Sequence, residues 1–237
     1  RRSAVHPDIL AMPFLVLLAG LALAPTDTVQ LVVVATTDVH GQVTDWDYLR
    51  NASAAGGLAR AATVIDSLRQ RYPGQLIVVD AGNALAGNPL AAYYGREASR
   101  DPHPVVEAMN LVGYDVATPG DRDFDFGVDR FNRAIAGATF HWVSANLQVL
   151  PADTLAFAPY VVIQRNGVRI AIAGVTTPGA MAWNWARLRG RLRVNRVEPA
   201  AARVLRDMHE NADLAIVLSH SGLGGGSGPG FDRHLKT

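Results

Sequence analysis

The sequence predicts an α/β domain with a largely parallel but mixed β-sheet. Short runs of β-branched and other apolar residues alternate with longer segments of helical apolar spacing, which is typical of a parallel sheet. The short runs are nearly continuous in apolar residues, as expected of strands that are buried on both faces. Asn166 and Gly167 separate two such runs, and this dipeptide predicts a tight antiparallel hairpin within the sheet.

The elements follow one another in a regular order. The first strand is predicted over residues 30–36 (QLVVVAT). A helix over 57–71 follows, and Pro73 and Gly74 stop it before a strand over 75–80. Further helices are predicted over 105–112, 128–136 and 199–211, and further strands over 115–118, 139–145, 160–165, 168–175 and 214–219. Without an internal repeat or linker, we expect one compact domain over residues 30–237.

The first residues predict export. Two arginines precede an apolar run over residues 9–24 that ends in Ala-Leu-Ala, which has the form of a signal-peptidase site. This run is shorter than the ~20 apolar residues that a bilayer span needs, so an uncleaved anchor is the alternative. We therefore expect residues 1–24 to be a signal peptide or anchor of a periplasmic or extracellular protein, which meets a membrane only through this segment.

Composition narrows the possible functions. The chain has 22 Lys and Arg against 21 Asp and Glu, so no bulk charge favours a nucleic acid polymer as partner. Arginines between positions 187 and 206 alternate with apolar residues, which favours the solvent face of a strand and a helix. The chain has no Cys, so any metal site must use His, Asp, Asn or Glu. The glycine-rich stretch over 222–230 predicts a flexible loop, because no Gly-Lys-Ser/Thr follows it.

Polar residues follow five predicted strands at the point where each strand ends. They are Asp38 and His40, Asn83, Asp121 to Asp125, Asn146, and His220. The carboxyl ends of parallel strands share one edge, where ligands usually bind. Asp, His and Asn without Cys suit divalent ions such as Mn, Zn, Co or Fe. Two such ions ~3.5 to 4 Å apart can activate water against a phosphoryl group, so the pattern favours metal-assisted phosphoester hydrolysis.

Each of these residues also has a structural interpretation when it is taken alone. The alternatives are a turn or cap role for Asp38 and His40, a left-handed turn position for Asn83 and Asn146, a helix cap for Asp121 and Asp123, and a satisfied structural histidine for His220. The functional interpretation depends on the coincidence of all five loops at the same edge.

Five blocks of sequence resemble a known family. They are Asp38-Val39-His40-Gly41, Gly82-Asn83 with Gly87, Gly120-Asp121-Arg122-Asp123-Phe124-Asp125, Ser144-Ala145-Asn146-Leu147 and Ser219-His220-Ser221-Gly222. In order and spacing they are similar to the 5′-nucleotidase branch of the calcineurin-like metallophosphatases, over roughly residues 31–222. The resemblance implies a four-layer αββα sandwich of mixed sheets flanked by helices, with two divalent metal ions as cofactors.

The resemblance also implies a role for each matching residue. These roles are Asp38 and His40 on the first metal ion, Asn83 at the bridging position, Asp121 and His220 on the second ion, Arg122 and Asp125 as catalytic residues beside the scissile phosphate, and Arg122 and Asn146 as substrate contacts. Further ligands are expected in a Gly-His-x-His-type loop beyond residue 237, so we expect weak or no activity from these residues alone.

Three positions depart from the family pattern. Asn83 replaces a bridging aspartate, and its one neutral oxygen compensates two cations poorly. Asp121 replaces an asparagine and returns a carboxylate to the site. Arg122 replaces a histidine and cannot exchange a proton, although it can clamp phosphate oxygens with Asp125 as its partner.

The leading prediction is an exported metal-dependent phosphoesterase that hydrolyses a small-molecule phosphoester of the nucleotide class. One alternative keeps this chemistry for cyclic nucleotides or nucleotide sugars. Another is a catalytically impaired exported domain that binds metal or phosphate without turnover, and Asn83 and Arg122 are the residues that favour it.

Overall fold

The structure, a computed structural model, describes residues 28–96 and 102–222. The signal peptide or anchor predicted over residues 1–24 lies outside the described residues, as does all but the first residue of the predicted glycine-rich loop. None of the helices in the described part of the chain combines the length and apolar character that a membrane crossing requires.

The first sheet has four parallel strands in the order β1-β4-β5-β6. Their bounds are β1 Val32–Thr36, β4 Leu76–Asp80, β5 Val116–Ala117 and β6 His141–Trp142. Side chains alternate across β4, so Leu76 and Val78 pack toward helices α1 (Leu58–Arg71) and α3 (Pro104–Val112). Predicted strands and helices of this half are confirmed, although β6 is shorter than the expected 139–145.

The second sheet has the order β12-β10-β9 and is mixed, as predicted. Its strands are β9 (Tyr160–Arg165), β10 (Val168–Thr176) and β12 (Leu214–His220), and β10 runs parallel to β12 but antiparallel to β9. Asn166 and Gly167 join β9 to β10 with φ of 48° and 81°, which matches the positive φ pair of a tight hairpin. The hairpin prediction is confirmed.

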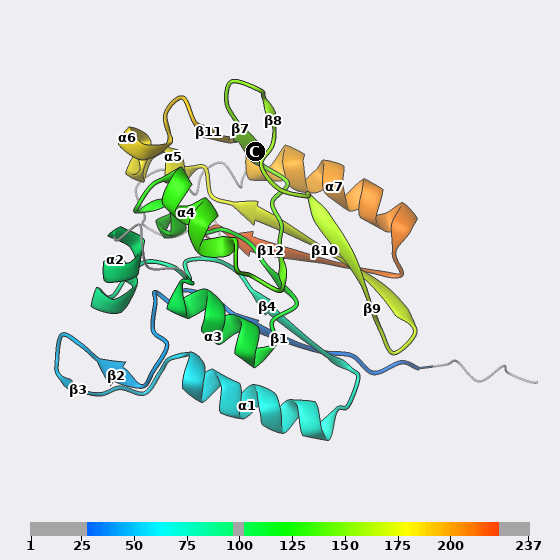
Figure 1. Cartoon of the computed structure of the whole chain (residues 1–237). Coiled ribbons are helices and arrows are strands. Elements are labelled where there is room, and N and C mark those ends of the chain that lie inside the picture. Colours follow the sequence, from blue (N-terminus) through cyan, green and yellow to red (C-terminus); the bar gives the residue numbers. More distant parts are fainter. Residues whose placement is uncertain (1–27, 97–101, 223–237) are drawn as a thin grey trace, which may run out of the picture.

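The two sheets pack face to face between layers of helices (Figure 1). Ile77 and Val79 of the first sheet meet Ile170 and Ile172 of the second in one buried cluster. On the outer face of β10, alternate small residues pack against helix α7 (Val197–Asn211). Figure 1 shows α7 on one side of the sheets and α1 with α3 on the other, which confirms the four-layer αββα architecture.

Several short elements were not predicted from the sequence. They are β2 (Trp46–Asp47), β3 (Ala52–Ser53), α2 (Pro89–Arg96), the 3₁₀ turn η1 (Arg122–Phe124), β7 (Leu147–Val149), β8 (Thr154–Leu155), α5 (Gly179–Trp183) and α6 (Trp185–Leu188). Strand β11 (Leu192–Val194), in contrast, lies within the arginine-containing segment for which a strand and a helix were expected. Helix α4 (Val128–Ile135) was predicted. Arg193 on β11 is exposed between buried Leu192 and Val194, in agreement with a solvated arginine face.

Candidate functional site

The loops that follow β1 and β4 are joined by three backbone hydrogen bonds. The N–H groups of Asp38, His40 and Gly41 donate to carbonyl oxygens of the second loop at 2.9, 2.8 and 2.8 Å. Asp38, His40 and Asn83 have φ of 53°, 50° and 61°, in the left-handed region that side chains rarely adopt. For Asn83 this conformation agrees with the left-handed turn position of the structural interpretation. At Asp38 and His40 it marks backbone strain of about 1–3 kcal/mol per residue, which concentrates at functional sites.

Two glycines leave room for the imidazoles of the site. A Cβ on Gly87 would lie 2.5 Å from the Cβ of His40, and a Cβ on Gly82 would lie 2.8 Å from Nδ1 of His220. Both distances are too short for any side chain. The two glycines therefore let the loop after β4 close against both histidines.

Both histidines have their ring orientation fixed by the backbone. Nδ1 of His40 lies 3.0 Å from the carbonyl oxygen of Ala86, and Nδ1 of His220 lies 2.8 Å from that of Ala81. Because a carbonyl only accepts, each Nδ1 is the protonated nitrogen and each Nε2 faces the cluster. This arrangement is typical of metal-binding histidines. Nε2 of His40 lies 3.5 Å from Oδ1 of Asp38, and Nε2 of His220 lies 2.9 Å from Oδ1 of Asp121.

Asn83 lies between the two acid–histidine pairs and is only 5% exposed. Its Nδ2 donates to Oδ1 of Asp38 at 3.0 Å and to Oδ1 of Asp121 at 3.3 Å. Its Oδ1 accepts the backbone N–H of Arg122 at 2.8 Å, and this bond sets the amide orientation, because a reversed amide would place two donors against each other. Asn83 therefore presents N–H groups, rather than its oxygen, to both carboxylates.

The oxygen and nitrogen donors of the cluster are of the types that divalent metal ions bind, but they lie in two separate pairs. Asp38 with His40, and Asp121 with His220, each offer one carboxylate oxygen and one imidazole nitrogen. Across residues 28–96 and 102–222, no three His, Cys, Asp or Glu side chains gather closely enough to hold an ion by themselves. The residues thus fit two half-sites, whereas the amide of Asn83 does not fit as a bridging ligand in this orientation.

Hydrogen bonds within the cluster shift the pKa values of Asp38, Asp121 and His220 toward their charged forms. Burial alone would raise the pKa of Asp38, but hydrogen bonds from Asn83 and Thr37 lower it below its usual value. Burial is likewise outweighed at Asp121, whose pKa is lowered by hydrogen bonds with His220 and Asn83. Burial opposes protonation of His220, yet its bonds to Asp121 and Ala81 raise its pKa. The His220–Asp121 pair is therefore an ion pair over a wider pH range than either residue alone would give.

Asp123 is a structural organiser of the site that the sequence did not assign. Its buried carboxylate accepts the backbone N–H groups of Asn83, Leu85 and Gly120 at 2.9, 2.8 and 2.8 Å. Burial raises its pKa against these bonds. The capping interpretation is wrong, because Asp121 forms no side-chain cap of η1 and Gly127 is the N-cap of α4. The feature of the sequence that could have identified Asp123 is its position between Asp121 and Asp125, two predicted site residues.

The Arg122–Asp125 ion pair follows directly after the site residue Asp121 in the chain. Nε and Nη2 of Arg122 both lie 3.3 Å from Oδ2 of Asp125, and the arginine side chain is 50% exposed. The guanidinium is therefore oriented by Asp125, as expected, and is accessible to a ligand. Neither residue lines the cavity described below.

The expectation that Asn146 contacts substrate is corrected by the structure. Asn146 is fully buried, and its Nδ2 donates to the carbonyl oxygens of Thr176 at 2.7 Å and Asn195 at 2.9 Å. Its Oδ1 accepts the backbone N–H of Thr176 at 2.9 Å. Because these bonds use both the NH2 group and the oxygen of the amide, Asn146 joins the start of β7 to the second sheet. The side chain has no polar group left for a ligand.

A cavity of about 540 Å³ opens above the cluster. Its lining includes Asp38, Asn83, Asp121 and His220, together with Thr177, Trp183, Ser219 and Ser221. The volume lies in the range of roughly 300–1,000 Å³ that is usual for small-molecule sites. Of the predicted metal ligands, the structure brings four to this cavity, while His40 lies against Asp38 outside its lining.

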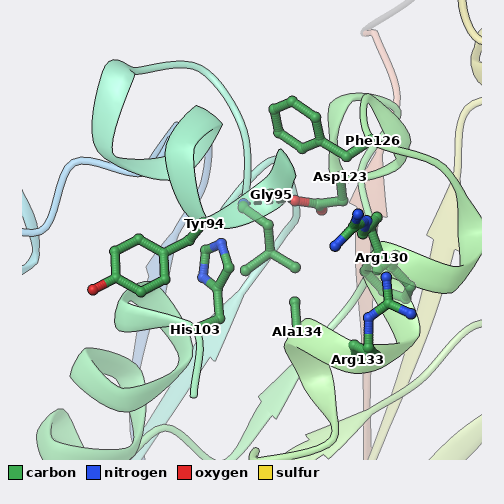
Figure 2. Close-up of a pocket in the computed structure, with 10 residues that line it drawn as sticks. Tyr94, Gly95, His103, Asp123, Phe126, Arg130, Arg133 and Ala134 are labelled. Atoms are coloured by element: carbon green, nitrogen blue, oxygen red, sulfur yellow. Dashed lines mark hydrogen bonds between the residues drawn. The ribbon is translucent and has the colours of Figure 1, made fainter. Parts of the chain in front are cut away.

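A second cavity lies between α2, α4 and His103, the residue that precedes α3 (Figure 2). In Figure 2, Tyr94 and His103 lie on one side of it and Arg130 and Arg133 on the other. Its volume of about 20 Å³ is enough for a water molecule but not for a phosphoester. The larger cavity is therefore the candidate site.

Known proteins resemble this chain in sequence and fold, although no family model matches it. It is 34% identical over 209 residues (83% of this chain) to a 2′,3′-cyclic-nucleotide 2′-phosphodiesterase/3′-nucleotidase of Salmonella typhimurium. It is 24% identical over 233 residues (94% of this chain) to a 5′-nucleotidase of Vibrio cholerae. The crystal structure of the calcineurin-like phosphoesterase YfkN from Bacillus subtilis matches 81% of this chain with a TM-score of 0.76 and 31% identity.

The chain corresponds to only part of each of these proteins. It spans 32% of the length of the Salmonella protein, 40% of the Vibrio protein and 62% of the YfkN chain.

Proposed function

The chain belongs to the 5′-nucleotidase branch of the calcineurin-like metallophosphatases, and we propose that it is the metal-binding domain of an exported phosphoesterase that hydrolyses nucleotides. The observation that carries this proposal is the pair of imidazoles whose Nε2 atoms face two carboxylates, both of which line one cavity. The domain would extend over residues 30–237 and follow an export segment over 1–24. The relatives' names support the nucleotide class.

Each residue has a stated task in this proposal. Asp38 and His40 would hold one divalent ion, and Asp121 and His220 a second, with Asn83 between them. When bound, ions of the Mn, Zn, Co or Fe class supply an activated water and neutralise phosphoryl charge.

Arg122 would bind the phosphate. Its guanidinium, held by Asp125, would donate to phosphate oxygens. Since arginine stays protonated, no proton transfer is assigned to it.

The test measures phosphate release from AMP, with Mn²⁺ or Zn²⁺ added and after metal removal, by a complete protein that contains this chain. We expect metal-dependent release that Asp38→Ala abolishes. The control is Asp45→Ala, because Asp45 is exposed on the loop that follows His40. Asn146 would not serve as a control, because it is buried. Release that is unchanged in Asp38→Ala, or equal without metal, would reject the proposal.

A second candidate function is metal or phosphate binding without turnover, and the orientation of Asn83 favours it. The amide donates to both carboxylates, which leaves neither of them free of a competing partner. If the parent releases no phosphate, but the double variant Asn83→Asp with Arg122→His does, the impaired function is the correct one.

The choice of ester is a separate question within the first candidate. Identity to the cyclic-nucleotide phosphodiesterase/3′-nucleotidase is 34%, against 24% to the 5′-nucleotidase. This difference supports 2′,3′-cyclic and 3′-nucleotides as substrates to test beside AMP. Their kcat/KM values relative to that of AMP decide the preference.

A further inference from the structure

We infer that the buried carboxylate of Asp80 is a positioning residue of the site, because it fixes the turn whose carbonyl oxygens hold His220 and Asp38. The inference rests on the proposed function and adds to it a residue that acts through the histidine rather than on the substrate. Asp80 is the last residue of β4 and has no exposed surface. Burial of a carboxylate costs free energy unless hydrogen bonds compensate it, so its partners indicate its role.

The turn that follows β4 contacts both halves of the site through its backbone. The carbonyl oxygen of Ala81 lies 2.8 Å from Nδ1 of His220, and the carbonyl oxygen of Gly82 accepts the N–H of Asp38 at 2.9 Å. The directions of these two carbonyl groups therefore determine where the imidazole of His220 and the backbone of Asp38 lie.

Asp80 holds the peptide group that His220 contacts. Its Oδ1 accepts the N–H of Gly82 at 2.9 Å and so closes an Asx turn over residues 80–82. This N–H and the carbonyl group of Ala81 belong to the same peptide group, which is planar. Fixing the N–H at one side of the plane therefore fixes the carbonyl direction at the other side. Without the carboxylate, the peptide group would lose this bond and would be free to turn its carbonyl away from His220.

The carboxylate of Asp80 is itself held in one orientation. Oγ1 of Thr36, on the neighbouring strand β1, donates to Oδ2 of Asp80 at 2.6 Å. The same Oγ1 lies 2.9 Å from the hydroxyl oxygen of Tyr114, which is buried. Both carboxylate oxygens of Asp80 therefore have a partner. A continuous series of hydrogen bonds leads from Tyr114 through Thr36 and Asp80 to the turn that holds His220.

The positioning role does not require a charge on Asp80. Burial raises the pKa of Asp80 to about 7, against the hydrogen bonds from Thr36 and Gly82. A proton on Oδ2 leaves Oδ1 able to accept the N–H of Gly82, and the hydroxyl of Thr36 accepts as well as donates. The amide of asparagine offers the same oxygen to Gly82. Asp80→Asn is therefore the conservative variant, and Asp80→Ala removes the acceptor.

Asp115 provides a matched control. Like Asp80 it is an aspartate that accepts a backbone N–H, that of Val78 at 2.9 Å, and its side chain is only 16% exposed. It also forms an ion pair with Arg165. Val78 lies in the middle of β4, whereas the site lies beyond the end of this strand. Asp115→Ala is therefore expected to lower the stability of the fold without changing the surroundings of His220.

The first measurement is the exchange with water of the Nδ1–H proton of His220, by NMR with isotope-labelled histidine in a complete protein that contains this chain. At about pH 5.5 and without metal, both ring nitrogens of His220 carry protons, because its pKa is raised above 6.5. The signal is identified by its absence in His220→Asn. We expect exchange to be at least about ten-fold faster in Asp80→Ala, and within about two-fold of the parent in Asp80→Asn and Asp115→Ala.

The second measurement is the Kd for Mn²⁺ by calorimetry. Removal of the outer partner of a metal-binding histidine usually weakens metal binding by about 10–100-fold, and we expect this loss in Asp80→Ala alone among these variants. The inference is overturned if Asp80→Ala leaves both measurements unchanged, or if Asp80→Asn or Asp115→Ala changes them as much as Asp80→Ala does.

A further variant decides the question if Asp80→Ala does not fold. Thr36→Val keeps the shape of the side chain and removes only the bond to Oδ2, so exchange at His220 should be about three-fold faster, and an unchanged rate overturns the inference. If the parent binds no Mn²⁺, the proposed function fails and the exchange rates decide the inference alone. If exchange is unchanged in Asp80→Ala but phosphate release still requires Asp38, the inference fails and the proposed function stands.

Discussion

The two acid–histidine pairs of the site differ although they face the same amide. In the open half, Asp38 and His40 are 47% and 35% exposed and their closest atoms lie 3.5 Å apart. In the closed half, Asp121 and His220 are 16% and 12% exposed and form a 2.9 Å hydrogen bond. The open half has strained backbone at both residues, whereas Asp121 has ordinary helical dihedrals.

The difference between the two halves corresponds to how closely each half keeps the family's residue types. The open half keeps the residue types of the resembling family, while the closed half carries Asp121 where an asparagine is expected. A carboxylate at this position neutralises a protonated His220, so the closed half has a partner without any ion. In the open half, strain and exposure keep the ligand atoms apart and accessible. An ion is therefore expected to enter at the open half more easily than at the closed half.

The largest expected effect on the free energy of unfolding comes from Asn83→Asp, which would place a carboxylate between the two halves of the site. The variant removes two N–H donors and places a third carboxylate, almost fully buried, beside Asp38 and Asp121. Without metal we expect a loss of about 3–5 kcal/mol in the free energy of unfolding. Mn²⁺ should recover this loss, because a bridging carboxylate binds cations. Urea denaturation with EDTA and with Mn²⁺ measures both effects.

Asn88→Asp is the matched control for that charge change. Oδ1 of Asn88 accepts the N–H of Ala91 at 2.8 Å, a bond that a carboxylate also makes. We expect less than about 1 kcal/mol of change and no dependence on Mn²⁺. Equal destabilisation by the two variants would show that Asn83 does not hold the carboxylates together.

Much of the scaffold could be predicted, because α1 and α7 show helical apolar spacing and β4 and β10 are nearly continuous apolar runs. The edge where the site forms also followed from strand order. The role of Asp123 could not be predicted, since two of its three backbone donors belong to Asn83 and Leu85, in the loop after β4. The orientation of Asn83 was equally hidden, because a backbone N–H sets it.

The remaining errors have a related cause. Asn146 stands in a block that resembles a substrate-binding segment, and only its burial reveals that its amide serves the backbone. Trp183 and Thr177 reach the cavity through short turns that have no periodic signal. Sequence order therefore located the edge of the site, whereas the direction and accessibility of each side chain required tertiary structure.

The next largest effect should come from Asp121→Asn, which opens the closed half. The lowered pKa of Asp121 gives stability that is present above its usual value of 3.8 and lost as the pH falls through its folded pKa. The raised pKa of His220 gives stability that is present below its usual value of 6.5 and lost as the pH rises through its folded pKa.

The cost of Asp121→Asn should therefore be largest between these values, at about 2 kcal/mol near pH 5.5, and decline above the folded pKa of His220. Urea denaturation at pH 5.5 and pH 9 measures it, and NMR titration should show the pKa of His220 falling. A cost that is equal at both pH values would mean that Asp121 and His220 do not act as an ion pair.

Asp38→Asn is the same substitution in the open half, and it should cost less. Asp38 is 47% exposed and 3.5 Å from His40, so solvent screens the pair and we expect a loss within about 1 kcal/mol near pH 7. Its lowered pKa places any loss above the usual value of 3.8, with less at more acidic pH. Urea denaturation beside Asp121→Asn gives the comparison directly. If Asp38→Asn is the more costly variant, the distinction between the halves is incorrect.

The smallest effect on stability should come from Arg122→Ala, which leaves both halves in place. Its ion pair with Asp125 is half-exposed, and its only assigned contact within the cluster is made by its backbone N–H, which alanine retains. The free energy of unfolding should therefore change by less than about 0.5 kcal/mol. Phosphate affinity in the presence of Mn²⁺, measured by calorimetry, should fall at least about ten-fold, because a charge-assisted donor pair is lost.

Arg122→Lys keeps the charge without the forked guanidinium, so an intermediate affinity would show that the guanidinium geometry, and not charge alone, binds the phosphate. Unchanged phosphate affinity in both variants would remove Arg122 from the site and leave Asp125 without a functional partner.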